Sequence, residues 1–210
     1  MATRARTSPP IDALRALASD PNVVEVRVRG RTVATLPRAR AETLGVAEGS
    51  AWTPALAARV CSAAAEALAR EAALAFLARR AWSAALLRAR LERAGHDAEA
   101  AAAAVGALVT DGWLDDRAYA RARAAQLSRR GAMAAEALEH AIVEEGVAER
   151  EARAAARAEA GTPEDLVREA RAARRAGAGP TRVAGRFARR GFDADTIRSA
   201  LERAGFDLDA

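Results

Sequence analysis

The sequence predicts an all-α protein of three tandem three-helix repeats, preceded by one small N-terminal β-hairpin. Three observations predict this fold. Alanine dominates the composition, one pattern of glycines and large apolar residues occurs three times, and helix-capping residues punctuate the chain from residue 53 onward. Only one short stretch near the N-terminus shows the alternation of apolar and polar residues that is typical of strands.

The composition favours helices with small cores. Alanine accounts for 62 of the 210 residues, and aromatic residues make up only 4%. Alanine has the highest helix propensity but buries little apolar area. We therefore expect thin, leucine-based cores spread along the chain. All 33 basic residues are arginine, a choice that the codon bias of a GC-rich genome explains together with the abundant alanine.

Two regions are predicted before the helices. Residues 1–10 (MATRARTSPP) are expected to form a disordered tail. In VVEVRVRGRTVATL, residues 23–36, valines alternate with charged residues and Gly30 stands where a turn would reverse the chain. We expect this hairpin to hold the only strands, within an N-terminal extension that covers residues 11–52. Two strands alone are marginally stable, so the hairpin should pack on a helix.

Capping residues mark where the helices begin and end. Thr53-Pro54 and Thr162-Pro163 each combine an N-cap with a first-turn proline, and Glu164 and Asp165 add acids to the first turn. Three further N-caps are expected at Ser83, Asp97 and Asp193. Glycines stand at the expected helix ends at positions 95, 131, 146, 161, 191 and 205.

The repeat emerges when the chain is aligned on Gly95, Gly146 and Gly191. A large apolar residue lies four positions before each glycine and another lies eight before. These expected core residues are Leu87, Leu91, Leu138, Ile142, Val183 and Phe187. Each unit also has room for one preceding helix, at 54–79, 115–129 and 162–176, so the repeats should cover residues 53–112, 113–160 and 161–210. Each is too small to bury its core without a neighbour.

Residues for chemistry are scarce. His96 and His140 lie far apart in the repeat scheme and have no further ligand at metal-binding spacing. Asp115 and Asp116 are best interpreted as a helix start, since one aspartate caps the backbone and both favour the positive end of the helix dipole. We expect no catalytic residue, no metal and no cofactor. Trp113 and Tyr119 are expected to be buried, because aromatic residues are rare here.

Other signals bear on the compartment. Cys61 has no partner for an internal disulfide, and no signal peptide or membrane-spanning run is present. We therefore expect a cytoplasmic protein without membrane contact, and we expect a monomer.

The charges are segregated along the chain. Residues 117–130 hold five arginines and no acid, and residues 168–190 hold eight arginines and one glutamate, whereas residues 136–165 hold nine acids and three arginines. Such segregation suggests a charged partner surface, although a solvated helix face explains any single arginine equally well. The expected contacts to a partner or to DNA are Arg117, Arg121, Arg168, Arg171, Arg175, Arg182, Arg186, Arg189 and Arg190.

The segment TDGWLDDRAYARA resembles the signature of the RecX family, bacterial regulators of the RecA recombinase. Residues 77–95, 129–147 and 183–201 are similar to the first, central and terminal segments of that family. No single motif is very specific, but the ordered set covers nearly the whole chain from about residue 22. The structural signature comprises Gly112, Trp113, Leu114, Asp115, Asp116, Tyr119 with the following alanine, Gly146, Gly191 and Phe192. Alanine at many apolar positions and arginine in place of lysine depart from the family pattern.

The resemblance implies an elongated, curved body of three helical repeats. It also implies binding in the helical groove of the RecA–single-stranded DNA filament, where such proteins block filament growth and reduce ATP hydrolysis, strand exchange and co-protease activity. The chain would then act in recombination, DNA repair and the SOS response, and would contact single-stranded DNA directly or through the filament. It would need no catalytic residues.

Other function classes stay open on the residues alone. The segment around residues 183–203 also fits a helix-turn-helix, which would make the protein a nucleic-acid binder that acts without a recombinase partner. Its second helix offers only Arg198 and Arg203 as long basic groups and has no Asn or Gln to recognise adenine. A purely scaffolding helical solenoid is a third possibility, and a small-molecule enzyme is a distant fourth.

Overall fold

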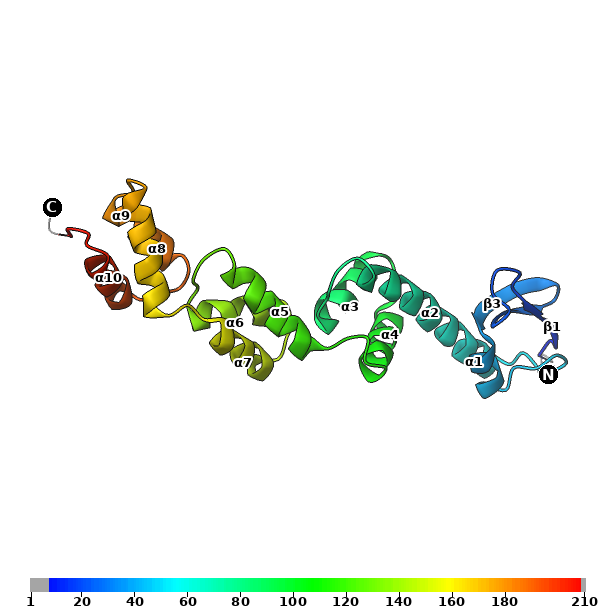
Figure 1. Ribbon diagram of the computed structural model, residues 1–210. Helices are drawn as coiled ribbons and strands as arrows, with labels where there is room; N and C mark the ends of the chain where they lie inside the picture. The colour runs from blue at the N-terminus through cyan, green and yellow to red at the C-terminus, as the bar shows by residue number, and fades with distance from the viewer. Residues whose placement is uncertain (1–7, 209–210) are drawn as a thin grey trace. The chain divides into compact units, whose positions relative to one another are not determined.

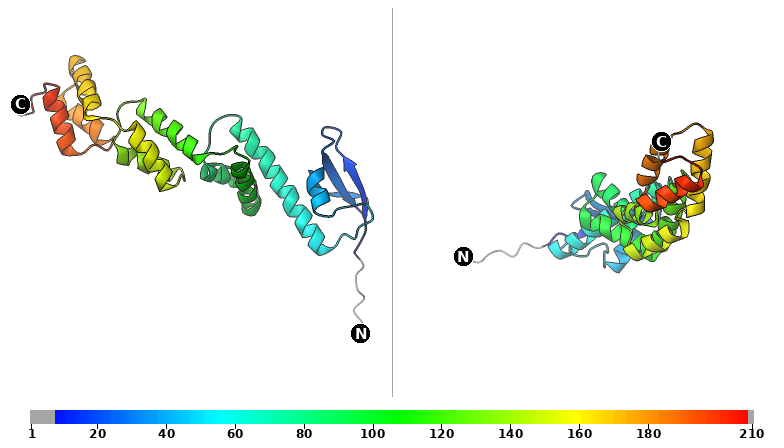
Figure 2. Two further views of the ribbon diagram at one scale, coloured as in Figure 1. Left: turned by 60° about the horizontal axis from the view of Figure 1, so that its bottom comes forward. Right: turned by 90° about the vertical axis from the view of Figure 1, so that its left-hand side faces the viewer.

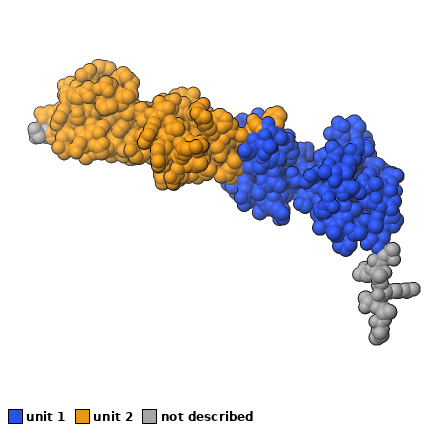
Figure 3. Space-filling view, turned by 90° about the horizontal axis from the view of Figure 1, so that it is seen from below, with its two compact units in different colours: residues 1–80, 87–111 blue, residues 81–86, 112–210 orange. Residues whose placement is uncertain are grey.

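The computed structural model describes residues 8–208, which form ten helices and a three-stranded sheet (Figure 1). The chain divides into two compact units (Figure 3). The first unit contains residues 1–80 and 87–111, and the second contains residues 81–86 and 112–210. The boundary falls within one helix, α3 (Ala84–Arg93): residues 84–86 belong to the second unit and residues 87–93 belong to the first.

The first unit begins with an antiparallel sheet in the order β1 (Ile11–Ala16), β2 (Val23–Val28) and β3 (Arg31–Pro37). The predicted hairpin is β2 and β3, but β1 was not predicted, so the expectation of strands only within residues 23–36 was wrong. The predicted tail falls mostly on residues 1–7, which lie outside the described residues. Its last residue, Pro10, forms a β-bridge with Ala51.

Three helices and most of a fourth complete the first unit. Helix α1 (Arg38–Thr43) follows the sheet, and α2 (Pro54–Leu77) contacts both β3 and α4 (Ala98–Thr110) (Figure 2). Helix α3 (Ala84–Arg93) contains the point where the two units divide. Val24, Val26 and Val28 of β2 belong to a core with Val60 of α2, so the sheet packs on a helix as expected.

The second unit contains the other six helices. The first triplet is α5 (Asp116–Ser128), α6 (Ala135–Glu144) and α7 (Glu149–Glu159). The second triplet is α8 (Pro163–Arg175), α9 (Pro180–Ala188) and α10 (Ala194–Arg203). Each triplet encloses a separate small core, one around Ile142 and the other around Phe187. The second and third of the three predicted helix triplets thus each form around a core, whereas the first is divided between the two units within α3.

The expected core residues of the repeat are buried. These are Leu87, Leu91, Leu138, Ile142, Val183 and Phe187, together with Tyr119. The prediction for Trp113 was wrong, because its side chain is 63% exposed. The chain leaves α4 through Gly112, whose φ is +77°, and the neighbouring Leu114 is the residue that turns into the core.

The predicted caps are present. Asp97, Asp193 and Thr53 each accept a hydrogen bond from a backbone N–H of the first turn, and Thr162 forms a reciprocal capping box with Asp165. Within residues 8–208 no helix combines the length and the apolar character needed to cross a membrane.

Candidate partner-binding surface

Within residues 8–208 no three His, Cys, Asp or Glu side chains converge to hold a metal ion. The candidate site therefore lies among the arginines and the signature residues. Some of these side chains hold the fold together, and others are free to contact a partner. The hydrogen bonds separate the two kinds.

The two signature aspartates cap two different helices. Asp115 accepts hydrogen bonds from the backbone N–H groups of Arg117 and Ala118, at 2.9 and 3.0 Å, as the helix-start interpretation expected. Asp116 accepts a hydrogen bond of 2.8 Å from the N–H of Ala84, the first residue of α3. The second role was not predicted, because it depends on a contact between segments 32 residues apart.

Glu145, at the end of α6, lies at the centre of a connected group of hydrogen bonds. Its carboxylate accepts from the Tyr119 hydroxyl at 2.7 Å and pairs with Arg123 at 2.7 Å. The hydrogen bond to Glu145 is the main cause that raises the pKa of Arg123. The buried Ser83 hydroxyl donates to the Glu145 carbonyl oxygen at 2.5 Å. Leu86 packs against the core cluster that contains Tyr119, so Tyr119 and Glu145 both hold the segment at residues 81–86.

The glycine that follows leaves space for the same segment. Gly146 has a φ of +80°, and a Cβ atom there would lie 2.2 Å from the Cβ of Ala85. A side chain at position 146 would therefore be strained and would collide with the start of α3. The signature residues Asp116, Tyr119 and Gly146 are explained by packing within the second unit.

A related arrangement joins α6 to the last triplet. The N–H of Ala134 donates to the carbonyl oxygen of Arg190 at 2.9 Å. Ser83, like Ala134, lies 12 positions before a repeat glycine. Their partners, Glu145 and Arg190, each lie one position before the next repeat glycine. The repeat in the sequence thus corresponds to a repeated contact. Gly191 continues the analogy, since a Cβ atom there would lie 2.6 Å from the Cβ of Ala137.

The side chain of Arg190 is occupied within the protein. It pairs with Glu169 at 2.7 Å and donates to the carbonyl oxygen of Arg130 at 2.8 Å. Glu169 also accepts from the N–H of Ala132 at 2.6 Å. The structure therefore gives Arg190 a role in holding the end of α9 to α8 and to the loop between α5 and α6, which explains its presence without a partner.

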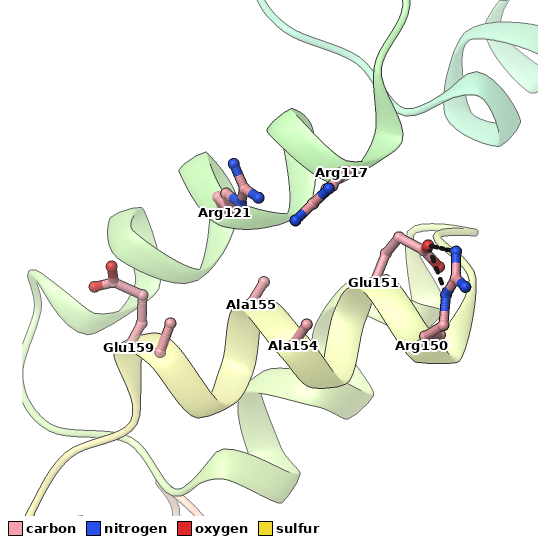
Figure 4. A pocket seen from close by; sticks show the side chains of 8 residues that line it. Arg117, Arg121, Arg150, Glu151, Ala154, Ala155 and Glu159 are labelled. Atoms are coloured by element: carbon pink, nitrogen blue, oxygen red, sulfur yellow. Dashed lines mark hydrogen bonds and ion pairs between the residues drawn. The ribbon is translucent and has the colours of Figure 1, made fainter.

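Arg117 and Arg121 line one wall of a groove between α5 and α7 (Figure 4). The groove has a volume of about 740 Å³. Ala154, Ala155 and Ala158 of α7 also line it. Its remaining lining residues are Arg150, Glu151 and Glu159. Arg150 was not among the predicted contacts, because nothing in the sequence indicates that the start of α7 lies beside α5.

The arginines of α8 are partly engaged. Arg168 forms an ion pair with Asp165, and Arg171 donates to the carbonyl oxygen of Arg203 at 3.0 Å. Arg175 is exposed and lines a shallow hollow together with Arg171 and Arg174. Arg174 was not predicted, although its spacing from Arg171 would have placed it on the same helix face.

The arginines of α9 and its C-cap differ in exposure. Arg182 and Arg189 are exposed. The guanidinium carbon of Arg186 lies 5.5 Å from the ring centre of Phe187, so this side chain covers the core of the last triplet. The predicted arginines thus do not form one continuous surface. Arg117 and Arg121 share a groove, whereas Arg168, Arg171, Arg186 and Arg190 are engaged within the protein.

Comparison with known proteins shows the fold. No protein-family model and no curated protein sequence matches the chain. The chain is similar to the crystal structure of regulatory protein RecX, with a TM-score of 0.66 and 15% identity over 95% of both chains. It is also similar to RecX from Lactobacillus salivarius, with a TM-score of 0.55 and 15% identity over 67% of this chain and 96% of that one. The chain therefore has the fold of RecX proteins.

Proposed function

We propose that this protein is a RecX-type regulator that binds the RecA–single-stranded DNA filament and mainly inhibits the recombinase. It would act in the cytoplasm, as a monomer, in recombination, DNA repair and the SOS response. The observation that carries the proposal is the likeness in fold to regulatory protein RecX over 95% of both chains. The ordered RecX-like motifs between residues 77 and 201 support it independently.

The chemistry of the surface supports regulation by binding. Arg117, Arg121, Arg175, Arg182 and Arg189 are exposed, and arginine binds carboxylate and phosphate groups with two parallel hydrogen bonds. A filament of protein wound on a polyanion offers both kinds of group. Inhibition of filament growth requires only that a bound protein blocks a surface, so no reacting side chain is needed.

Fluorescence anisotropy of the labelled protein tests the proposal. The protein is titrated with RecA alone, with a single-stranded oligonucleotide alone, and with the filament that RecA forms on that oligonucleotide. The proposal expects the tightest binding to the filament. Equal binding to the oligonucleotide with and without RecA would contradict it and favour a nucleic-acid binder that needs no recombinase.

A titration at several salt concentrations adds a second measure. Each phosphate contact that is made directly adds about −0.7 to the slope of log affinity against log salt on single strands. A steep slope for the filament therefore indicates that the protein reaches the DNA. A slope near zero would mean that few charged groups take part, contrary to the proposal.

A further inference from the structure

The groove between α5 and α7 combines a small-residue floor with free positive charge. Ala154, Ala155 and Ala158 carry only methyl groups, so another chain can approach the backbone of α7 closely. Within residues 8–208, the guanidinium groups of Arg117 and Arg121 make no hydrogen bond and no ion pair, although the backbone N–H of Arg117 is bonded to Asp115. Figure 4 shows both on α5, across the groove from the alanines of α7.

The α7 side of the groove carries carboxylates. Glu151 pairs with Arg150 at 2.7 Å. The hydrogen bond from Arg150 is the main cause that lowers the pKa of Glu151, and the charge of Arg117 adds a smaller effect. Glu159 lines the other end of the groove. The α5 wall is therefore basic, while α7 contributes the Arg150–Glu151 ion pair at one end of the groove and the carboxylate of Glu159 at the other.

This distribution of charge disfavours a nucleic-acid strand as the occupant. Phosphates that follow the whole groove would meet the carboxylate of Glu159 and the neutralised Arg150–Glu151 pair as well as the arginines of α5, and like charges repel. The alanine floor also offers no aromatic surface on which a base could stack. A protein segment avoids both problems, because it can present carboxylates to α5 and small apolar groups to α7.

The spacing of the arginines specifies the kind of segment. Arg117 and Arg121 lie one helical turn apart, so their side chains project from the same face of α5. Two carboxylates one turn apart on another helix have the matching separation. We propose that the groove binds an acidic helical segment of a partner protein, with two carboxylates on Arg117 and Arg121 and its apolar face on the alanines. Only the identification of the partner as RecA rests on the proposed function.

A synthetic helix tests the groove without the recombinase. The probe is an alanine-based peptide of about 20 residues, long enough to be helical in water, with two glutamates one turn apart. A matched peptide has glutamine at both positions. In a nuclear magnetic resonance titration of the full chain, the glutamate peptide should shift the signals of Ala154 and Ala158, and the glutamine peptide should bind about tenfold more weakly or not at all.

Two test variants and one control variant check the residues. R117E/R121E should lose the shifts, and Ala154→Trp should lose them by filling the groove without a change of charge. The control R129E/R157E makes the same change of charge at exposed positions outside the groove and should bind the glutamate peptide as the wild type does. Thermal melts followed by circular dichroism confirm that each variant is folded.

The outcomes separate the two proposals. Absence of shifts with the glutamate peptide, or equal shifts with both peptides, would overturn the groove as a site for acidic helices. Competition by an oligothymidine strand at the same alanines would assign the groove to nucleic acid and would also overturn it. Failure of the wild type to bind the RecA filament, with the peptide shifts intact, would contradict only the proposed function.

Discussion

The guanidinium of Arg190 lies 2.7 Å from the carboxylate of Glu169, and this pair is the charge-reversed counterpart of the 2.7 Å pair between Arg123 and Glu145. Arg190 and Glu145 occupy the same position in the repeat, one residue before its glycine. Their partners lie near the middle of the first helix of each triplet. If the residue before one glycine docked on the first helix of the other triplet, Glu145 would face Glu169 and Arg190 would face Arg123. Like charges would then repel, so the reversed charges disfavour this exchange.

Arg190→Ala should therefore destabilise the fold although the residue is polar and partly exposed. The change leaves Glu169 and the carbonyl oxygen of Arg130 without this donor, which costs about 1–3 kcal/mol of unfolding free energy. Urea denaturation measures the loss. The double variant E169R/R190E should recover part of it, and an unfolding free energy for Arg190→Ala equal to that of the wild type would contradict the role of the pair.

Gly146→Ala should cost more stability than Gly95→Ala. Both glycines have positive φ, +80° and +95°, so alanine is strained at either position by about 1–2 kcal/mol. At Gly146 the added Cβ atom also meets Ala85 at 2.2 Å, whereas at Gly95 nothing lies within 4 Å. Equal melting temperatures for the two variants would show that the start of α3 does not pack against Gly146.

Truncation to alanine should lower the unfolding free energy strongly at Phe187 and hardly at all at Trp113. Phe187 is fully buried, with the ring of Phe192 edge-on at a centre-to-centre distance of 6.4 Å. Phe187→Ala should cost about 3–5 kcal/mol of unfolding free energy, because it leaves a cavity in a small core. Trp113→Ala should change stability by no more than about 0.5 kcal/mol. A large loss for Trp113→Ala would mean that this side chain is buried in solution.

Acid should weaken the start of α8 through Asp165. Hydrogen bonds from the backbone and hydroxyl of Thr162, and then the ion pair with Arg168, lower the pKa of Asp165 below its ordinary value of 3.8. The folded state therefore binds this proton less readily than the unfolded state does. The stabilisation is present above about pH 4 and is lost as the pH falls through the lowered pKa.

Asp165→Asn isolates this contribution. The difference in unfolding free energy between the wild type and the variant should be constant near neutral pH and should shrink below about pH 4. Urea denaturation at a series of pH values measures it. A difference that does not change with pH would show that the ionised carboxylate is not what caps the helix.

The helical part of the fold could be predicted because its signals are local. A cap such as Thr162-Pro163 and a terminal glycine such as Gly146 act within a few residues of each other, so they are readable in the sequence. Strand β1 could not be predicted, since Ile-Asp-Ala-Leu-Arg-Ala has no strand alternation and becomes a strand only by pairing with β2. The prediction that Trp113 is buried was wrong for a related reason, because the exposure of its side chain depends on the path of the chain after Gly112.

The candidate site was predictable only in part. The spacing of Arg117 and Arg121 placed them on one helix face, and the structure places both on one groove. The engagement of Arg190 could not be seen, because its partner Glu169 lies 21 positions away on another helix. Spacing along one helix predicts which side chains share a face, whereas their availability depends on the neighbouring helices.

The rate of DNA-dependent ATP hydrolysis by RecA, measured on single-stranded DNA with increasing amounts of this protein, tests the central claim most directly. The account predicts that the rate falls as the protein is added, and that R129E/R157E lowers it as the wild type does. R117E/R121E, at the same concentration, should lower the rate less. A hydrolysis rate that stays unchanged at every concentration of a correctly folded wild-type protein would contradict the account.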